Sequence, residues 1–141
     1  MKIAVLGIGG IGGVVGGSLA AKFNDINLIA RGETLKNIRQ NGLTLKSDKL
    51  GTFTVKPAIV TDDANEIGVV DALIIATKSY GLEAACRQCE PIIGPETIVL
   101  PLLNGVCVSD DVKEIIGNKG DIADGCIMLF QILYPRELLP I

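Results

Sequence analysis

Short apolar runs alternate with segments of helical periodicity from the start of the chain. Residues 2–6 (KIAVL) form an apolar, β-rich run that ends in glycine, and residues 26–30 (INLIA) form a second run, typical of buried parallel strands. Small and apolar residues continue from 10 to 23 without a proline, which predicts a helix between these strands. A second helix is expected over residues 32–41, with Gly42 as its C-terminal cap.

The rest of the chain continues this alternation after a looser segment. Residues 43–60 alternate irregularly, which indicates short strands or a hairpin. Residues 69–76 (VVDALIIA) are the strongest predicted strand, residues 97–100 (TIVL) are another, and a last strand is expected over residues 122–129. Strands that alternate with helices predict a mainly parallel sheet with right-handed crossovers. The expected fold is therefore a Rossmann-type, doubly wound α/β domain with helices on both faces.

Two further helices are expected between these later strands. The first stops at Pro91. Ser109 is the expected N-cap of the second, Asp110 and Asp111 suit the positive end of its dipole, and Gly117 ends it.

The first of these helices contains a Cys-x-x-Cys spacing, which elsewhere serves redox and zinc sites. A redox pair normally stands at a helix start, and a four-thiolate zinc site needs a second close pair. Here the two thiols instead belong to an apolar stripe at i, i+3, i+4 and i+7, formed by Leu82, Ala85, Cys86 and Cys89. We therefore interpret both cysteines as small core residues.

A glycine-rich turn follows the first predicted strand and opens the first predicted helix. It reads Gly-Ile-Gly-Gly-Ile-Gly, the G-x-G-x-x-G motif in the context that dinucleotide binding requires. Gly7 permits the tight turn, Gly9 leaves room for a diphosphate, and Gly12 lets the helix pack close to the strand. The diphosphate is expected at the helix N-terminus, held by unpaired N–H groups and the dipole. The expected cofactor-binding residues of this turn are Gly7, Ile8, Gly9, Gly10, Ile11 and Gly12.

The residue after the second strand indicates which dinucleotide binds. NAD-binding domains usually carry Asp or Glu there, about 20 residues after the glycine turn, to bind the ribose hydroxyls. This chain has Arg31, whose guanidinium suits a 2′-phosphate through bidentate, charge-assisted hydrogen bonds. Such a bond contributes about 1.5–3 kcal/mol, or roughly tenfold to over a hundredfold in affinity. We therefore expect NADP rather than NAD, although Glu33 lies nearby in sequence.

Two polar residues follow later strands, at the edge of the sheet where ligands bind in open α/β folds. Lys78 follows one apolar run and Asn104 follows the next. Taken singly, such a lysine is usually a surface residue, and Asn-Gly after a strand is usually a turn. An ammonium group can hold a carboxylate or polarise a carbonyl, and an amide can fix a ribose or a substrate.

Together with the glycine turn, these residues make the chain similar to the N-terminal domain of the ketopantoate reductase (2-dehydropantoate 2-reductase) family. The resemblance covers roughly residues 1–128. The matching residues are the turn from Gly7 to Gly12 with Gly16, Arg31, the Gly42-Leu43 step, Thr77-Lys78-Ser79-Tyr80, and Leu102-Leu103-Asn104-Gly105-Val106.

The resemblance implies an enzyme that reduces ketopantoate to pantoate with NADPH, in pantothenate biosynthesis. It also implies that Lys78 and Asn104 line the nicotinamide and substrate side, with catalytic and cofactor-binding roles. Residues 1–128 are then the NADP-binding domain. Residues 129–141 are a short divergent tail, which a natural truncation, a frame shift or deliberate trimming would each explain.

Family members continue into a helical domain that supplies a catalytic lysine and most substrate contacts, and we expect that domain to be absent here. The chain alone is then expected to bind NADPH, to turn over weakly or not at all, and to form homodimers or aggregates through the face left uncovered.

Composition narrows the remaining possibilities. A net charge of −3 argues against a nucleic-acid partner. The sequence contains no histidine, which excludes His-ligated metals and imidazole bases, and we expect no metal site. Its four cysteines form no dense disulfide framework, and no apolar run reaches membrane-spanning length. We expect a cytoplasmic protein.

Three alternatives remain open at this point. The chain could belong to a related reductase of another 2-oxo or 3-oxo acid, because substrate choice would depend on a second domain. It could also be a non-catalytic NADP-binding remnant, although the presence of Lys78 and Asn104 argues against long decay. A methyltransferase is a weaker alternative, because Arg31 replaces the acidic residue expected there.

Overall fold

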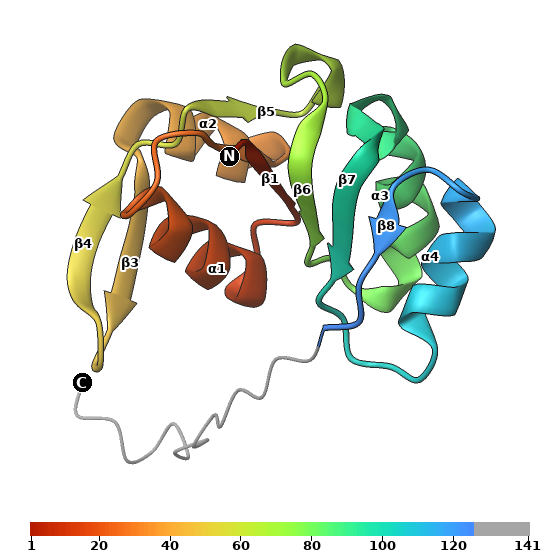
Figure 1. The fold of residues 1–141 in the computed structure, drawn as a ribbon. Coiled ribbons are helices and arrows are strands. Elements are labelled where there is room, and N and C mark those ends of the chain that lie inside the picture. Colours follow the sequence, from red (N-terminus) through yellow and green to blue (C-terminus); the bar gives the residue numbers. More distant parts are fainter. Residues whose placement is uncertain (126–141) are drawn as a thin grey trace.

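A six-stranded sheet, in which every pairing is parallel, forms the centre of the computed structural model, which describes residues 1–125. The strand order is β5-β2-β1-β6-β7-β8 (Figure 1). The strands are β1 (Ile3–Leu6), β2 (Ile26–Ile29), β5 (Ile59–Thr61), β6 (Val70–Ile75), β7 (Ile93–Pro101) and β8 (Asp121–Ile122). The chain starts in the middle, runs outward to β5, and returns to β6 beside β1. This order is that of the Rossmann fold, and the predicted fold class is confirmed.

Helices cover both faces of the sheet. Figure 1 shows α1 on one side with the antiparallel hairpin of β3 (Leu43–Ser47) and β4 (Gly51–Val55), and α3 and α4 on the other. The α-helices are α1 (Gly10–Ala20), α2 (Gly32–Asn41), α3 (Leu82–Cys89) and α4 (Val108–Ile116). Three short 3-10 turns, η1 (Ala64–Glu66), η2 (Ser79–Gly81) and η3 (Glu90–Ile92), complete the connections. None of the helices described is long and apolar enough to cross a membrane.

Side chains alternate between two hydrophobic cores, one on each face. In β1, Ile3 and Val5 belong to the core under α1, while Ala4 and Leu6 belong to the core under α3 and α4. All four residues of β1 and all four of β2 are buried. Burial on both faces explains why these strands are continuously apolar in sequence. Each fully buried aliphatic side chain contributes roughly 1.5–3 kcal/mol.

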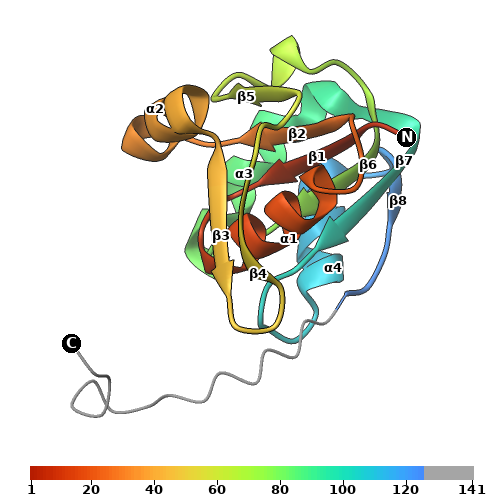
Figure 2. The same ribbon diagram turned by 90° about the vertical axis from the view of Figure 1, so that its left-hand side faces the viewer.

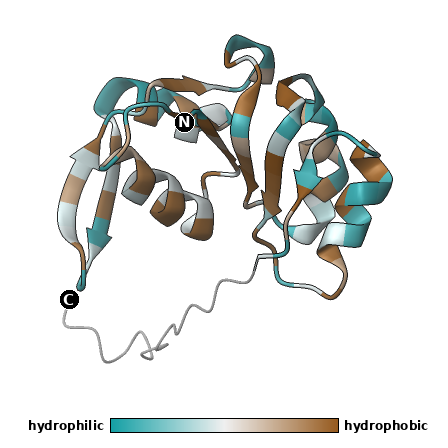
Figure 3. Cartoon of the chain, in the orientation of Figure 1, coloured by the Kyte–Doolittle hydropathy of each residue, from teal (hydrophilic) through white to brown (hydrophobic). Residues whose placement is uncertain are grey.

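Helix α1 is packed on two sides. Its residues are small or apolar apart from one serine, and Figure 3 shows it in brown and white. On the sheet side, a Cβ at Gly16 would lie 2.8 Å from Leu28. On the other side, a Cβ at Gly17 would lie 2.6 Å from Leu45 of the antiparallel hairpin β3 (Leu43–Ser47) and β4 (Gly51–Val55). A helix without a polar face needs cover on more than one side. The hairpin covers the outer side of α1 around Gly17 (Figure 2), while Val14 stays exposed.

The predicted element types are confirmed along the described residues, and several boundaries are corrected. Helix α1 ends at Ala20 rather than at residue 23. Strand β7 begins at Ile93 rather than Thr97, because its pairing with β6 contains an irregularity between Val70 and Ala72. Such an irregular start tolerates the Gly-Pro pair that hid the strand in sequence.

The N-cap of α4 is Cys107 and not Ser109. The backbone at Cys107 has a φ of 66°, a left-handed turn that starts the helix earlier than the sequence suggested. Gly117 ends this helix and Gly42 ends α2, as predicted. The last predicted strand is represented by β8, and its expected continuation to residue 129 extends outside the described residues, as does the predicted tail, 129–141.

Candidate functional site

A cavity of about 550 Å³ opens at the carboxyl ends of the central strands. Four segments that follow β1, β2, β6 and β7 form its walls. It lies at the switch point where the chain direction across the sheet reverses between β1 and β6. The cavity brings together all but one of the predicted site residues: Gly7, Ile8, Gly9, Gly10, Ile11, Arg31, Lys78 and Asn104. Gly12 lies behind this wall, buried in α1.

Backbone contacts force the conformation of the glycine turn. Gly7 has a φ of 91°, and a Cβ there would lie 2.8 Å from the carbonyl oxygen of Ala76. A Cβ at Gly12 would lie only 1.9 Å from the carbonyl oxygen of Gly7. Side chains are therefore excluded at both positions by main-chain atoms, which cannot move aside as flexible side chains do. These contacts hold the start of α1 against the ends of β1 and β6.

The middle of the turn faces open space instead. A Cβ at Gly9 or Gly10 would meet no other protein atom within 4 Å. Gly9 is the N-cap of α1, so no side chain caps the first-turn N–H groups, and this turn contains no acidic residue. Unpaired N–H groups and the positive end of the helix dipole favour an anion at this place. The residues present thus fit a phosphate group above Gly9.

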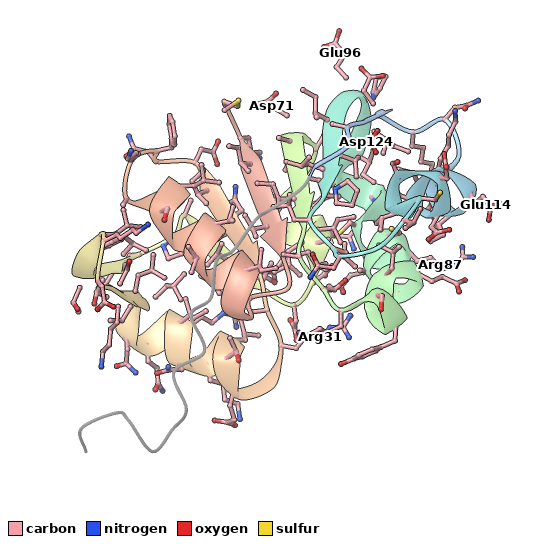
Figure 4. All side chains as sticks on the ribbon, turned by 90° about the horizontal axis from the view of Figure 1, so that it is seen from below. Arg31, Asp71, Arg87, Glu96, Glu114 and Asp124 are labelled. Atoms are coloured by element: carbon pink, nitrogen blue, oxygen red, sulfur yellow. The ribbon has the colours of Figure 1, made fainter. Side chains whose placement is uncertain are left out.

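Arg31 extends over the cavity from the end of β2. It is exposed, and one of its terminal nitrogens donates a hydrogen bond to Oε1 of Gln88 on α3. Gln88 in turn donates from Nε2 to the carbonyl oxygen of Asp62, at 2.7 Å. In Figure 4, which shows the molecule from below, Arg31 lies beside α3 at this edge of the sheet. A guanidinium, a planar fork of N–H donors, is thus placed where the cavity meets the end of β2, whereas Asn104 follows β7.

Lys78 and Asn104 stand at the ends of the neighbouring strands β6 and β7. Lys78 precedes the η2 turn, and Asn104 lies in the loop before α4. Both are exposed, and within residues 1–125 neither side chain forms a hydrogen bond. An ammonium group and an amide are therefore available to a ligand on this side of the cavity.

The cysteines of α3 are core residues, as predicted. Cys86 and Cys89 are buried together with Leu82 and Ala85. Burial raises the pKa of Cys86 to about 11, with a smaller contribution from Glu90, and raises the pKa of Cys89 to about 12. Both are thus protonated at neutral pH and unsuited to nucleophilic chemistry. No cluster of three metal-binding side chains occurs among the residues that the structure describes.

Sequence reasoning missed the wall that α3 contributes. Ala84, Ala85 and Gln88 line the cavity, and Gln88 contacts Arg31. The available signal was the composition of α3, in which Gln88 is an uncharged polar residue beside the apolar stripe while its neighbour Arg87 is charged. Its contact with Arg31 spans 57 positions in sequence and is a product of the tertiary fold.

Comparisons with known proteins identify the family of the chain. The model of the family described as "Ketopantoate reductase PanE/ApbA" matches residues 3–133. A 2-dehydropantoate 2-reductase of Mesorhizobium japonicum is 37% identical over 107 residues, which are 75% of this chain and 32% of the relative. The crystal structure of 2-dehydropantoate 2-reductase from Porphyromonas gingivalis superposes with a TM-score of 0.80 at 35% identity, over 89% of this chain and 46% of that one.

A third similar structure is a ternary complex of D-mandelate dehydrogenase with NADH and anilino(oxo)acetate. It is 30% identical, with a TM-score of 0.77, and the match covers 89% of this chain and 40% of that one. The chain thus spans less than half the length of each of these three relatives.

Proposed function

The chain belongs to the ketopantoate reductase family, and from this premise we propose that it binds NADPH in the cavity at the carboxyl ends of β1, β2, β6 and β7. We propose further that the protein reduces 2-dehydropantoate to pantoate with this cofactor. One observation carries the proposal: a phosphate-binding turn, a guanidinium and a Lys–Asn pair line the same cavity. The reaction is proposed for the protein as a whole, since this chain covers less than half of its relatives' length.

The turn from Gly7 to Gly12 would hold the diphosphate. The free first-turn N–H groups of α1 and the open space above Gly9 support this role. The close contact of Gly12 with Gly7 keeps the helix start rigid, so that the N–H groups are oriented before the ligand arrives.

Arg31 would bind the 2′-phosphate of the adenosine ribose. Its position after β2 is the one at which an acidic side chain would instead accept hydrogen bonds from ribose hydroxyls. An arginine at this position forms bidentate contacts to phosphate and repels no anion. We therefore propose NADPH as the preferred cofactor.

Lys78 and Asn104 would act on the nicotinamide and substrate side. When bound, the reduced nicotinamide supplies a hydride to the substrate carbonyl. The Lys78 ammonium would bind the carboxylate of a 2-oxo acid or stabilise negative charge on its carbonyl oxygen. The Asn104 amide would fix the ribose or the substrate by hydrogen bonds. Both groups are free of side-chain hydrogen bonds within residues 1–125, as such roles require.

A reductase of a different 2-oxo acid is a second candidate. The similarity to D-mandelate dehydrogenase, at 30% identity, favours it because that structure contains anilino(oxo)acetate, a different oxo acid. The cavity described here would bind the cofactor in the same way in either reaction.

The free thiols of the described residues, Cys86, Cys89 and Cys107, fit a reducing cytosol, which we propose as the location.

A fluorescence titration of the nicotinamide tests the cofactor proposal. We expect the chain to bind NADPH at least tenfold more tightly than NADH. Equal affinities for NADPH and NADH would contradict the proposed role of Arg31. If neither dinucleotide binds, the whole proposal is wrong. NADPH oxidation by the whole protein with 2-dehydropantoate and with aryl-substituted 2-oxo acids then separates the two candidate reactions. A protein that binds NADPH and oxidises it with neither substrate class would be a non-catalytic binding protein.

A further inference from the structure

The contact between Arg31 and Gln88 joins two walls of the cavity that are 57 residues apart in sequence. We propose that Gln88 is a positioning residue that sets the preference for NADPH over NADH, by holding the guanidinium of Arg31 over the cavity. This inference rests on the proposed function, because it requires a nicotinamide dinucleotide in this cavity.

The carboxamide of Gln88 has a fixed orientation. Its Nε2 donates to the carbonyl oxygen of Asp62 at 2.7 Å, so Oε1 must face away from that carbonyl and accept the bond from Arg31. Asp62 follows β5, and β5 pairs with β2, the strand that Arg31 follows. Gln88 therefore binds to the ends of two adjacent strands at once.

The backbone below Gln88 is held rigidly as well. Ala85, Cys86 and Cys89 surround it on α3, and all three are buried in the core under the sheet. Gln88 itself is half-buried, and it lines the cavity with Ala84 and Ala85. The acceptor for Arg31 is thus presented by a rigid element, whereas Arg31 is an exposed side chain with many accessible rotamers.

A neutral acceptor suits this task better than a charged one. Glu83 on the same helix shows the alternative, since its carboxylate pairs with Arg87 at 3.0 Å on the outer side. A carboxylate at position 88 would neutralise Arg31 and repel a phosphate. Gln88 accepts a hydrogen bond from one terminal nitrogen of the guanidinium. The positive charge of Arg31 and its remaining N–H donors stay available to the ligand.

This arrangement affects the two dinucleotides differently. Holding Arg31 in place before binding reduces the conformational entropy lost when a 2′-phosphate is bound. NADH has a hydroxyl at that position and gains little from the guanidinium. Removing Gln88 should therefore weaken the binding of NADPH and leave that of NADH unchanged.

The test measures the dissociation constants of NADPH and NADH for variants of the 141-residue chain. We expect Gln88→Ala to weaken NADPH binding roughly three- to tenfold with no change for NADH. Gln88→Glu should weaken NADPH binding further. In the Arg31→Ala background, Gln88→Ala should have no additional effect, since Gln88 acts through Arg31.

Two further variants control for structural effects. Arg87→Ala removes a cation from the outer side of α3, where Figure 4 shows it, and should change neither constant. Gln88→Met keeps the length of the side chain without its hydrogen bonds and should match Gln88→Ala, which covers the case in which the alanine variant fails to fold.

Three results would overturn the proposed role of Gln88. Equal weakening of NADPH and NADH would make Gln88 a merely structural residue and overturn the inference. So would unchanged NADPH binding in both Gln88→Ala and Gln88→Met while Arg31→Ala still abolishes the preference, a result that would leave the proposed function intact. Failure of the unmodified chain to bind either dinucleotide would overturn both.

Discussion

The wall of the cavity next to β1 is built from main chain, whereas the wall between β2 and α3 is built from side chains. Next to β1, glycines press backbone against backbone, and a Cβ at Gly12 would overlap the carbonyl oxygen of Gly7. Between β2 and α3, Arg31 and Gln88 meet through their terminal polar groups. The first wall has one possible shape, while the second can be altered by single substitutions without disturbing the sheet. We propose that the main-chain wall binds the part that all nicotinamide dinucleotides share, and that the side-chain wall distinguishes among them.

The largest effect is expected from Gly12→Ala, which tests how rigid the main-chain wall is. The new Cβ would lie 1.9 Å from Gly7 O, so α1 must shift away from the sheet. We expect the free energy of unfolding to fall by about 3 kcal/mol or more, measured by urea unfolding.

Gly13→Ala is the matched control, because its Cβ would have Ile8 as its nearest neighbour at 4.0 Å. It should leave stability unchanged or raise it by up to about 1 kcal/mol. Equal stability of the two variants would contradict the close approach.

Gly9→Val should separate binding from stability. A Cβ at Gly9 meets no protein atom within 4 Å, so the side chain should extend into the space assigned to the diphosphate. Loss of several phosphate–N–H bonds should weaken NADPH and NADH alike, by roughly a hundredfold or more, with Tm nearly unchanged. A variant that binds both dinucleotides normally would place the diphosphate elsewhere.

Arg31→Ala should affect only the discrimination. We expect NADPH affinity to fall roughly tenfold to a hundredfold and NADH affinity to stay the same, in the same fluorescence titration. A parallel loss for both dinucleotides would show that Arg31 belongs functionally with the main-chain wall. Arg39→Ala, which removes an exposed cation of α2 whose Nε binds Val60 O, is the matched control.

The smallest effect concerns the helix behind the side-chain wall. Because burial raises the pKa of Cys86 to about 11 and of Cys89 to about 12, folding favours the neutral thiols. The free energy that these neutral thiols contribute to folding is fully present below the pKa of an unfolded cysteine, about 8.5. It is lost as the pH rises toward the folded-state pKa values of about 11 and 12. Urea unfolding should show a loss on the order of 1 kcal/mol per thiol between pH 7.5 and 9.5. A Cys86→Ala, Cys89→Ala double variant should remove this slope, and its persistence would assign the slope to other groups.

The contrast between the two walls also explains which parts of the cavity could be predicted from the sequence. Features of the main-chain wall are local: a strand, a glycine turn and a helix follow one another within 20 residues, and all three were predicted, although the helix ends at Ala20 rather than at residue 23. The ends of β2, β6 and β7 were also located, because buried parallel strands are continuously apolar. Arg31, Lys78 and Asn104 were singled out for that reason, as polar residues directly after such runs, and all three line the cavity.

Features that depend on tertiary contacts were missed. The pairing of Gln88 with Arg31 joins distant segments, and nothing in the local pattern of α3 indicates it. The left-handed backbone at Cys107 has no glycine to indicate it, and the Gly-Pro pair at the irregular start of β7 predicted a turn where the pairing with β6 continues the strand. Ser109, a good capping residue by type, was therefore chosen wrongly.

The hairpin β3–β4 has a consequence for the dynamics of binding. It lines no part of the cavity, yet Leu45 packs against Gly17 and covers the outer side of α1. Amide protons of α1 near Gly17 should therefore exchange with solvent slowly, at a rate that depends on how often the hairpin detaches. A segment outside the cavity would thus stabilise the helix whose N-terminus we propose to bind the diphosphate.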